Sequence, residues 1–533
     1  MRPMSDAPAP RTRRGGALAV GAGIFLSKVA GLVRVRAVAH YLGQGGSADA
    51  LTAALRIPNI LQNLLGEGVL SASFIPAYSS LRAEGREEDA QRLARTIGTM
   101  MALLALILSA IGVTTAGPIV DVLVGGFSPE KRELTVALVR IIFPGMALLV
   151  RSAWCLGVLN SHRQFFLSYV SPVLWNAAMI GAAIIGGRRF IGHTDDVAIW
   201  LAWGSVIGAA AQFLVQLPFV LRLLRGFKPT LATKDPSVRQ TIRAFGTILI
   251  GRGSVQISGF IDQALASYLG GGIVTAMTNA QTLYMLPISL FGMAVSAAEL
   301  PEMSSATGDD AERAVALRTR LEPALRRVVF LVVPSAVAFV MIGRSIISLL
   351  FETGRFGAAD TQIVWMILAG SAIGLSAGTQ GRLLGSAFYA LKDPRRPLYA
   401  ALVRVSITGI AGYALAMPLR DFFGYSAGWG AFGLTASTGF AGWVELVLLV
   451  RWLRQRIGSL KMPTGLGLAA LAIAALAGAA AYGVDHAAHA LQLRRTICSV
   501  AAIATYGVLY LGVSAAVGLP EAHAFLRRAL RRK

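Results

Sequence analysis

Charged residues are scarce in this chain, and acidic residues are the scarcest of them. Only 14% of the 533 residues are Asp, Glu, Lys or Arg, whereas 55% are hydrophobic. A soluble globular protein of this length does not need so much apolar sequence, so the composition indicates a polytopic membrane protein. Lys and Arg number 50 against 27 Asp and Glu. In a membrane protein this excess is expected in cytoplasmic loops, so we predict no nucleic-acid partner.

Several chemistries are also missing. The two cysteines, Cys155 and Cys498, lie far apart in apolar runs and offer neither a disulfide framework nor metal-ligand spacing. The sequence has no phosphate loop of the form GxxxxGK followed by Ser or Thr, which argues against ATP hydrolysis. The acidic pairs at 195–196 and 309–310 lack the neighbouring acids of a magnesium-dependent prenyl-phosphate transferase. We therefore expect no metal, no cofactor and no enzymatic activity.

Long apolar runs are what the sequence has in abundance. A membrane helix needs about 20 mostly apolar residues, and on that rule we predict an all-α, polytopic membrane protein with about 14 transmembrane helices. The first run is too long for a signal peptide and has no small-residue cleavage site, so we expect it to be retained. The predicted spans are 16–42, 48–80, 95–117, 133–160, 164–187, 196–222, 241–269, 273–303, 324–343, 361–390, 397–418, 428–450, 463–484 and 496–518.

Lys and Arg are spread unevenly among the connections between these runs. If the N-terminus is cytoplasmic, the inner connections and the two tails carry most of the basic residues, and the outer connections carry few. This asymmetry predicts an even number of spans with both termini in the cytoplasm.

A weak internal repeat divides the chain. Tyr-Leu-Gly at 41–43 precedes a turn and a long segment that contains Pro58, and Tyr-Leu-Gly at 268–270 precedes a similar segment that contains Pro287. Paired repeats with interrupted helices are typical of transporters, although Gly and Pro in apolar sequence could also recur by chance. The predicted parts are a cytoplasmic tail at 1–15, an N-lobe of six helices at 16–225, a C-lobe of six helices at 226–455, two C-terminal helices at 456–520 and a basic cytoplasmic tail at 521–533.

Charges inside the predicted spans are the candidate functional residues. Lys28 and Arg34 lie near the middle of the first span, with no acid in that span to neutralise them. A buried cation is costly, so by default it marks a transport path or a ligand site. Six residues apart, the two differ by about 120° around a helix and fit one wide cavity. The other intramembrane charges are Arg36, Asp49, Arg56, Glu67, Arg140, Arg151, Arg252, Asp262 and Arg382.

Plainer roles are open to several of these charges. Arg36 and Arg140 could extend toward an interface, Asp262 could pair with a basic neighbour, and Glu67 could satisfy backbone groups freed by the glycines on either side of it. Cations nevertheless outnumber acids, so the set would attract an anion. Arg fits phosphate oxygens by paired hydrogen bonds, which makes a phosphate or pyrophosphate the natural ligand.

The motifs around these charges resemble the MurJ (MviN) family of lipid II flippases, in the multidrug/oligosaccharidyl-lipid/polysaccharide exporter superfamily. The resemblance covers essentially the whole chain and implies 14 helices, two lobes and a central cationic cavity. It also implies export of the undecaprenyl-pyrophosphate-linked peptidoglycan precursor, lipid II, across the bacterial inner membrane for cell-wall biogenesis. The similar segments are 27–34, 41–43, 48–50, 56–59, 66–76, 286–294 and 387–397.

Position by position, the resemblance extends to individual residues. Lys28 and Arg34 match the family's two basic cavity positions on the first helix, although Lys28 stands where Arg is usual. Asp49 matches an acid that opens the second helix, and Glu67 the acid of a Gly-Glu-Gly break. Arg382 lies where a basic residue can occur on the tenth helix. The full set that we predict to bind substrate is Lys28, Arg34, Asp49, Arg56, Glu67, Arg252, Asp262 and Arg382.

Two positions depart from the family pattern. Gln62 stands where a basic residue is often found in the second helix, and Thr282 stands where the eighth helix usually has an arginine. Arg252 on the preceding helix could supply the missing charge. The departures leave open the exact lipid-linked substrate.

The predicted mechanism is alternating access, driven by the membrane potential or by a monovalent ion bound at Asp49 or Asp262. Other hypotheses remain. The cargo could be another polyprenyl-linked glycan, or the chain could be a degenerate, non-transporting scaffold. A drug antiporter should favour acids in its cavity, and a membrane transferase or phosphatase should carry an acid-rich metal motif or a His/Arg set that we do not find.

Overall fold

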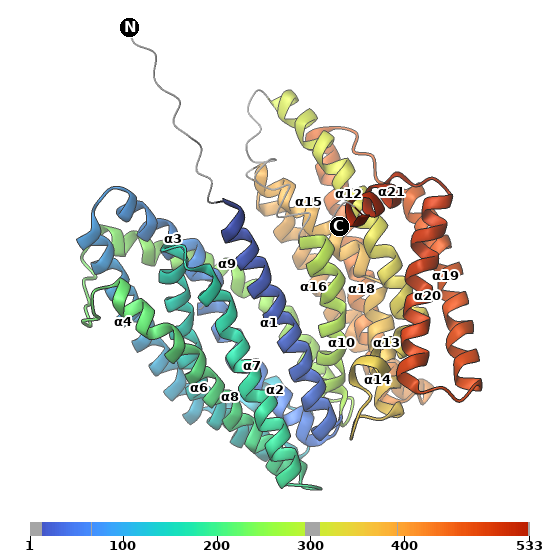
Figure 1. Cartoon of the computed structure of the whole chain (residues 1–533), viewed down its shortest axis with the longest axis horizontal. Coiled ribbons are helices and arrows are strands. Elements are labelled where there is room, and N and C mark those ends of the chain that lie inside the picture. The colour runs from blue at the N-terminus through green and yellow to red at the C-terminus, as the bar shows by residue number, and fades with distance from the viewer. Residues whose placement is uncertain (1–12, 66, 294–309, 392, 531–533) are drawn as a thin grey trace. The chain divides into compact units, whose positions relative to one another are not determined.

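The computed structural model describes residues 13–65, 67–293, 310–391 and 393–530, and within these ranges every regular element is a helix (Figure 1). The helices group into two compact units, Met1–Phe260 and Ile261–Lys533. The all-α prediction is therefore confirmed for the described part of the chain.

The first unit contains eight complete helices and most of a ninth. The most extensive packing joins α7 to α8, α6 to α8, and α1 to α7. The helices are α1 (Arg13–Leu42), α2 (Gly46–Leu65), α3 (Glu67–Ala83), α4 (Glu87–Thr114), α5 (Ala116–Leu123), α6 (Pro129–Ser161), α7 (Phe165–Arg189), α8 (Thr194–Leu223) and α9 (Pro236–Ser267), the last of which continues into the second unit.

The second unit is also built by packing of helices on one another. Its most extensive packing joins α16 to α18, and α19 to α20. The elements are α10 (Ile273–Pro287), a π-helical turn η1 (Ile288–Met293), α12 (Asp310–Met341), α13 (Gly343–Phe351), α14 (Ala358–Ala372), α15 (Leu375–Ala390), α16 (Arg395–Ala416), α17 (Pro418–Phe423), α18 (Ala427–Ile457), α19 (Thr464–Ala490), α20 (Arg495–Ala516) and α21 (Pro520–Leu530).

The apolar runs of the sequence become membrane-length helices. In the described residues, 9 helices are long and apolar enough to cross a bilayer, and α14 with α15 forms one more span that is bent by 45°. The four remaining predicted spans coincide with α1, with α2 and α3, with α9, and with α10 and its π-helical turn. The last of these predicted spans, 273–303, extends beyond the described residues after Met293. The first three of these spans carry seven of the eight residues that we predict to bind substrate.

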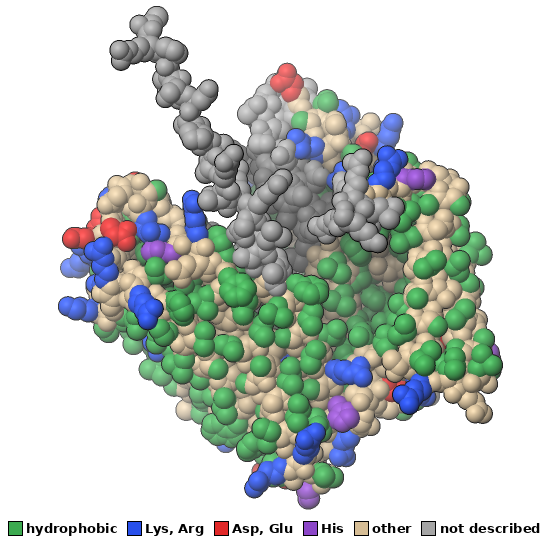
Figure 2. Space-filling model, in the orientation of Figure 1, with side chains coloured by type: hydrophobic (Ala, Val, Ile, Leu, Met, Phe, Trp, Pro, Cys, Tyr) green, Lys and Arg blue, Asp and Glu red, His purple; other side chains and the backbone are tan. Residues whose placement is uncertain are grey.

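The surface agrees with a bilayer environment. On the face in Figure 2, hydrophobic side chains cover the middle of the helices, and charged side chains gather near the helix ends. Leu106 on α4 is 63% exposed and Ile207 on α8 is 62% exposed, which suits contact with lipid. The prediction of a polytopic membrane protein is confirmed.

Polar contacts dock the connection between α8 and α9 onto α4. Arg95 on α4 donates to the carbonyl oxygen of Leu224 at 2.8 Å, and the Thr99 hydroxyl accepts from the backbone N–H of Thr230 at 3.2 Å. The connection is thereby held along one face of the first unit.

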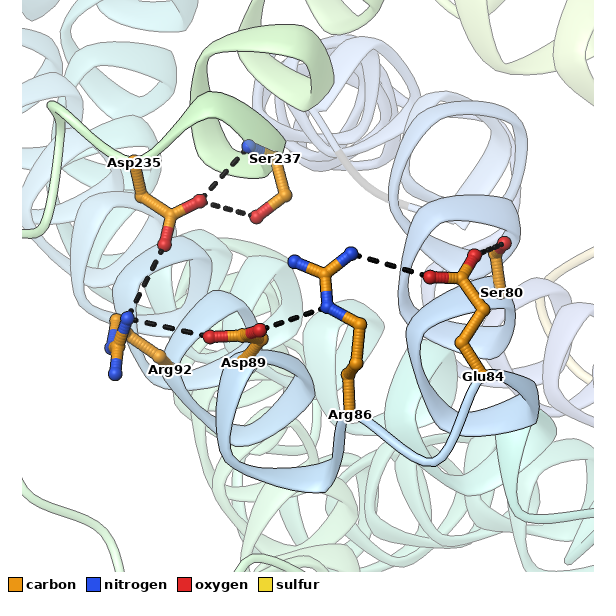
Figure 3. Close-up of polar contacts among 7 residues, drawn as sticks. All are labelled: Ser80, Glu84, Arg86, Asp89, Arg92, Asp235 and Ser237. Carbon is orange, nitrogen blue, oxygen red and sulfur yellow. Dashed lines mark hydrogen bonds and ion pairs between the residues drawn. The ribbon is translucent and has the colours of Figure 1, made fainter.

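A charge network continues this docking to the start of α9 (Figure 3). Arg92 on α4 lies 3.6 Å from a carboxylate oxygen of Asp235 and 3.4 Å from one of Asp89. Asp235 in turn accepts from the backbone N–H and the hydroxyl of Ser237. Asp89 also accepts from Arg86, at 3.0 Å, which extends the network to the turn between α3 and α4.

Candidate functional site

Arg34 is held in place by two side chains of α7. Its Nε donates to Oδ1 of Asn176 at 3.0 Å, and its guanidinium carbon lies 5.0 Å from the centroid of the Trp175 ring. The Asn176 amide donates in turn to the carbonyl oxygen of Pro172, which fixes the orientation of the acceptor. Because α1 and α7 are closely packed, this arginine is a pre-positioned cation.

The fork of Arg34 keeps donors for a ligand. Among the described residues, only Asn176 accepts a hydrogen bond from this guanidinium, and it uses Nε. The two terminal nitrogens point away from that bond in the fixed fork geometry that pairs with carboxylate or phosphate oxygens.

Lys28 lies on the same helix but in a different setting. Its side chain is exposed, and no carboxylate among the described residues pairs with it. An exposed ammonium on a membrane-length helix faces water or polar groups, because hydrocarbon contact is costly. Arg34 and Lys28 together give α1 two cations with no described acidic partner.

Asp49 is paired with a basic residue of another helix. Its carboxylate is fully buried and lies 2.7 Å from Nζ of Lys131, which is 11% exposed. Nζ of Lys131 also lies 4.1 Å from the centroid of the Phe127 ring. The pair ties the start of α2 to the start of α6. A role of Asp49 in binding substrate or an ion stays a prediction.

Arg56 also makes a contact between helices. Its Nη2 donates to the carbonyl oxygen of Gly259 on α9 at 2.8 Å. A Cβ at position 259 would lie 2.8 Å from that nitrogen, so a larger residue there would require the end of the arginine to shift. The contact links α2 to α9 within the first unit.

The remaining predicted residues are placed less completely. Glu67 begins α3 directly after the predicted break, and Arg252 lies in α9, but both side chains fall outside the described residues. Asp262 and Arg382 belong to the second unit, on α9 and α15; the first is half-buried and the second is exposed. Of the predicted residues with described side chains, four lie in the first unit, namely Lys28, Arg34, Asp49 and Arg56. Asp262 and Arg382 lie in the second unit.

An ion pair in the second unit was not predicted from the sequence. Nη1 of Arg404 on α16 lies 3.2 Å from Oε2 of Glu445 on α18. Each residue interrupts an apolar run at 397–418 or 428–450, so the charge survey that found Lys28 could have found both. The partners Asn176 and Trp175 gave no such signal, because neither is charged.

Thr282, at the departure in α10, uses its hydroxyl within its own helix, where it donates to the carbonyl oxygen of Thr278 at 2.9 Å. It therefore does not replace the donor that an arginine would provide.

Comparisons with known proteins agree with the motifs. A family model described as lipid II flippase MurJ matches residues 38–501. A lipid II flippase MurJ of Burkholderia cenocepacia is 30% identical over 527 residues, covering 96% of this chain and 98% of that protein.

Two solved structures share the fold. A structure titled lipid II flippase MurJ, inward closed conformation, aligns with a TM-score of 0.71 at 20% identity, over 94% of this chain and 99% of that one. An inward-facing multidrug resistance MATE family transporter of the MOP superfamily aligns with a TM-score of 0.63 at 16% identity, over 84% and 99%. Since the family model spans most of the sequence and the Burkholderia protein is similar over its whole length, the chain belongs to the lipid II flippase MurJ family.

Proposed function

We propose that this chain carries lipid II from the cytoplasmic to the periplasmic leaflet of the bacterial inner membrane, for cell-wall synthesis. Membership of the MurJ family and the membrane-length helices support a multi-pass inner-membrane flippase. The structural observation that carries the proposal is Arg34, which α7 holds by one nitrogen and leaves able to donate with the other two.

Arg34 and Lys28 would act on the pyrophosphate. A guanidinium already oriented by Asn176 and Trp175 loses little conformational freedom when it binds two phosphate oxygens. Lys28 is a compact charge on a flexible stem, so it can follow the phosphate as the surroundings change. Arg34 thus supplies a fixed pair of donors, and Lys28 supplies a mobile counter-charge.

The cycle would be alternating access, in which the site opens first to the cytoplasm and then to the periplasm. The polyprenyl tail would stay in lipid, beside the apolar faces of α19 and α20. Moving net charge through the field is worth about 2.3 kcal/mol per charge per 100 mV, so the membrane potential could drive the cycle. The alternative source of energy is a monovalent ion bound at Asp262. We place both termini in the cytoplasm, because the basic connections favour that side.

The test is transport by single variants of the full chain. Lys28→Ala and Arg34→Ala should each lose most lipid II translocation in vesicles and fail to sustain growth when the endogenous flippase is depleted. Arg140→Ala is the matched control, since Arg140 is an exposed arginine inside α6 and should keep wild-type transport. Equal amounts of each variant in the membrane must be verified by immunoblot.

Two outcomes would count against the proposal. Wild-type transport by both α1 variants would remove the assignment of the site. Depletion of the chain without accumulation of lipid II on the cytoplasmic leaflet would remove the assignment of the cargo.

A further inference from the structure

The Arg404–Glu445 ion pair lies deep within two membrane-length helices of the second unit. Arg404 lies about 13 Å along α16 from its start, and Glu445 lies about 18 Å from the end of α18, at 1.5 Å per residue. Their side chains are 33% and 15% exposed, so neither is sealed off. Burying charges at such depth costs free energy, so by default they mark a functional site.

Two further polar side chains converge on this pair. The Tyr284 hydroxyl of α10 lies against α15, 3.7 Å from where a Cβ at Gly378 would be. Arg382 follows Gly378 by one helical turn on the same face of α15. Both Arg382 and Arg404 are close enough to the Tyr284 phenol to act on it electrostatically.

A second contact brings Glu445 to the same place. Leu449 follows Glu445 by one turn on α18, and its Cδ1 lies 3.8 Å from where a Cβ at Gly381 would be. Gly381 directly precedes Arg382. Helices α10, α15, α16 and α18 therefore present Tyr284, Arg382, Arg404 and Glu445 to one region of the second unit.

The charges in this cluster do not balance. Two guanidinium groups face one carboxylate, and the described residues supply Arg382 with no acid of its own. A net positive charge within membrane-length helices attracts an anion, and arginine with a hydroxyl donor suits phosphate oxygens.

We propose that Arg404, Arg382 and the Tyr284 hydroxyl form an anion site in the second unit, in which Glu445 is an internal counter-ion that a phosphate oxygen displaces from Arg404. The site takes the phosphate or pyrophosphate of a ligand. The identity of that ligand as the lipid-linked cargo rests on the proposed function. Because the phosphate oxygen replaces Glu445 as the acceptor, the charge of Arg404 stays paired throughout the exchange.

This arrangement predicts opposite effects for the two partners of one ion pair. Arg404→Gln removes a charged donor and should weaken binding about tenfold or more. Glu445→Gln removes the competitor for Arg404 and should tighten binding about threefold or more. A purely structural ion pair predicts no opposite shifts, since losing either partner would only lower thermal stability.

The experiment measures equilibrium affinity on the purified full chain in detergent, in an Arg34→Gln background that weakens the first unit's site. Inorganic pyrophosphate and undecaprenyl pyrophosphate are the two probes, and they separate a free anion from a lipid-linked one. Tyr284→Phe, which keeps the ring, should weaken binding severalfold, and Arg451→Gln, an exposed arginine on the same helix as Glu445, should leave it unchanged. Unfolding temperatures establish that each variant is folded.

The outcomes separate this inference from the proposed function. The inference is overturned if neither probe binds, or if the Arg404 and Glu445 variants shift affinity in the same direction or not at all. If these shifts are opposite but the Lys28 and Arg34 variants transport lipid II normally, the anion site stands and the assignment of the transport site falls.

Discussion

The hydroxyl of Tyr510 on α20 donates to the carbonyl oxygen of Phe330 on α12 at 2.7 Å. Phe330 lies four residues before Pro334, whose ring nitrogen has no hydrogen to donate to that carbonyl. The Tyr506 hydroxyl, one turn earlier on α20, donates to the carbonyl oxygen of Pro334 itself at 2.6 Å. Two tyrosines thus satisfy the helix at its proline and fasten the C-terminal hairpin, α19 and α20, to α12.

Replacing Tyr510 with Phe should therefore destabilise the second unit by about 1–3 kcal/mol, because a buried carbonyl loses the hydroxyl donor while the ring packing is kept. The measurement is the unfolding temperature of the full chain in detergent. Tyr482→Phe is the control, since Tyr482 is 61% exposed on α19. Equal unfolding temperatures for the two variants would show that the hydroxyl contributes nothing.

The buried pair of Asp49 and Lys131 makes a sharper prediction. Removing one partner leaves an uncompensated charge, so Asp49→Asn or Lys131→Met should each destabilise the chain by about 3–5 kcal/mol. The double variant should recover much of this loss, because no lone charge remains. A thermal-unfolding double-mutant cycle measures the coupling. Additive losses of stability would contradict a direct pair. Normal stability with lost transport in Asp49→Asn would instead support the prediction that this acid binds substrate.

The docked connection before α9 should respond to pH. The Ser237 hydroxyl first, then the backbone N–H groups at the start of α9 and the Arg92 guanidinium, hold the pKa of Asp235 below its ordinary value. Because the folded pKa is lower than the unfolded one, the contribution of Asp235 is complete above the ordinary pKa of about 3.9 and is lost as pH falls through the lowered value.

Hydrogen exchange of the Ser237 amide, which donates to Asp235 at 2.9 Å, is the suitable readout. Protection should be unchanged between about pH 7 and pH 5, above the ordinary pKa, and should fall in more acidic solution. Asp235→Asn should show the low-pH behaviour already at pH 7. Arg36→Gln on α1 serves as the control for loss of a charge elsewhere. If protection declined near pH 6, Asp235 would not be the responsible group.

The hydrophobic runs predict most of the fold, since each of the 14 predicted spans overlaps a helix or two consecutive helices. The break predicted at the glycines around Glu67 falls at Gly66, which lies outside the described residues. The 45° bend between α14 and α15 was not predicted. A Cβ at Gly374 would lie 2.5 Å from Cα of Gly439, and Trp443 donates to the carbonyl oxygen of Ile373 at 2.8 Å. Both contacts at the bend come from α18, so local sequence cannot show them.

The candidate site divides in the same way. Charge inside an apolar run identified Lys28 and Arg34, because a cation that is costly to bury can be recognised from the sequence alone. Whether such a charge is available depends on its partner, and Asn176 and Lys131 come from helices 142 and 82 residues away. The same sequence rule therefore could not show that Arg34 is held by a neutral amide whereas Asp49 lies in a buried ion pair.

Close helix packing gives the last prediction. Gly98 on α4 faces the Trp154 ring on α6, where a Cβ would lie 2.6 Å from Cε2, and the ring is fixed because Nε1 donates to the carbonyl oxygen of Ala94 at 3.1 Å. Gly98→Ala should therefore destabilise the first unit by about 1–3 kcal/mol through overpacking, despite the better helix propensity of alanine. Gly181→Ala on α7, where no atom lies within 4 Å, should leave the unfolding temperature unchanged or raise it. If Gly98→Ala also raised it, the ring would have to move freely, and α4 and α6 would not be held together through this contact.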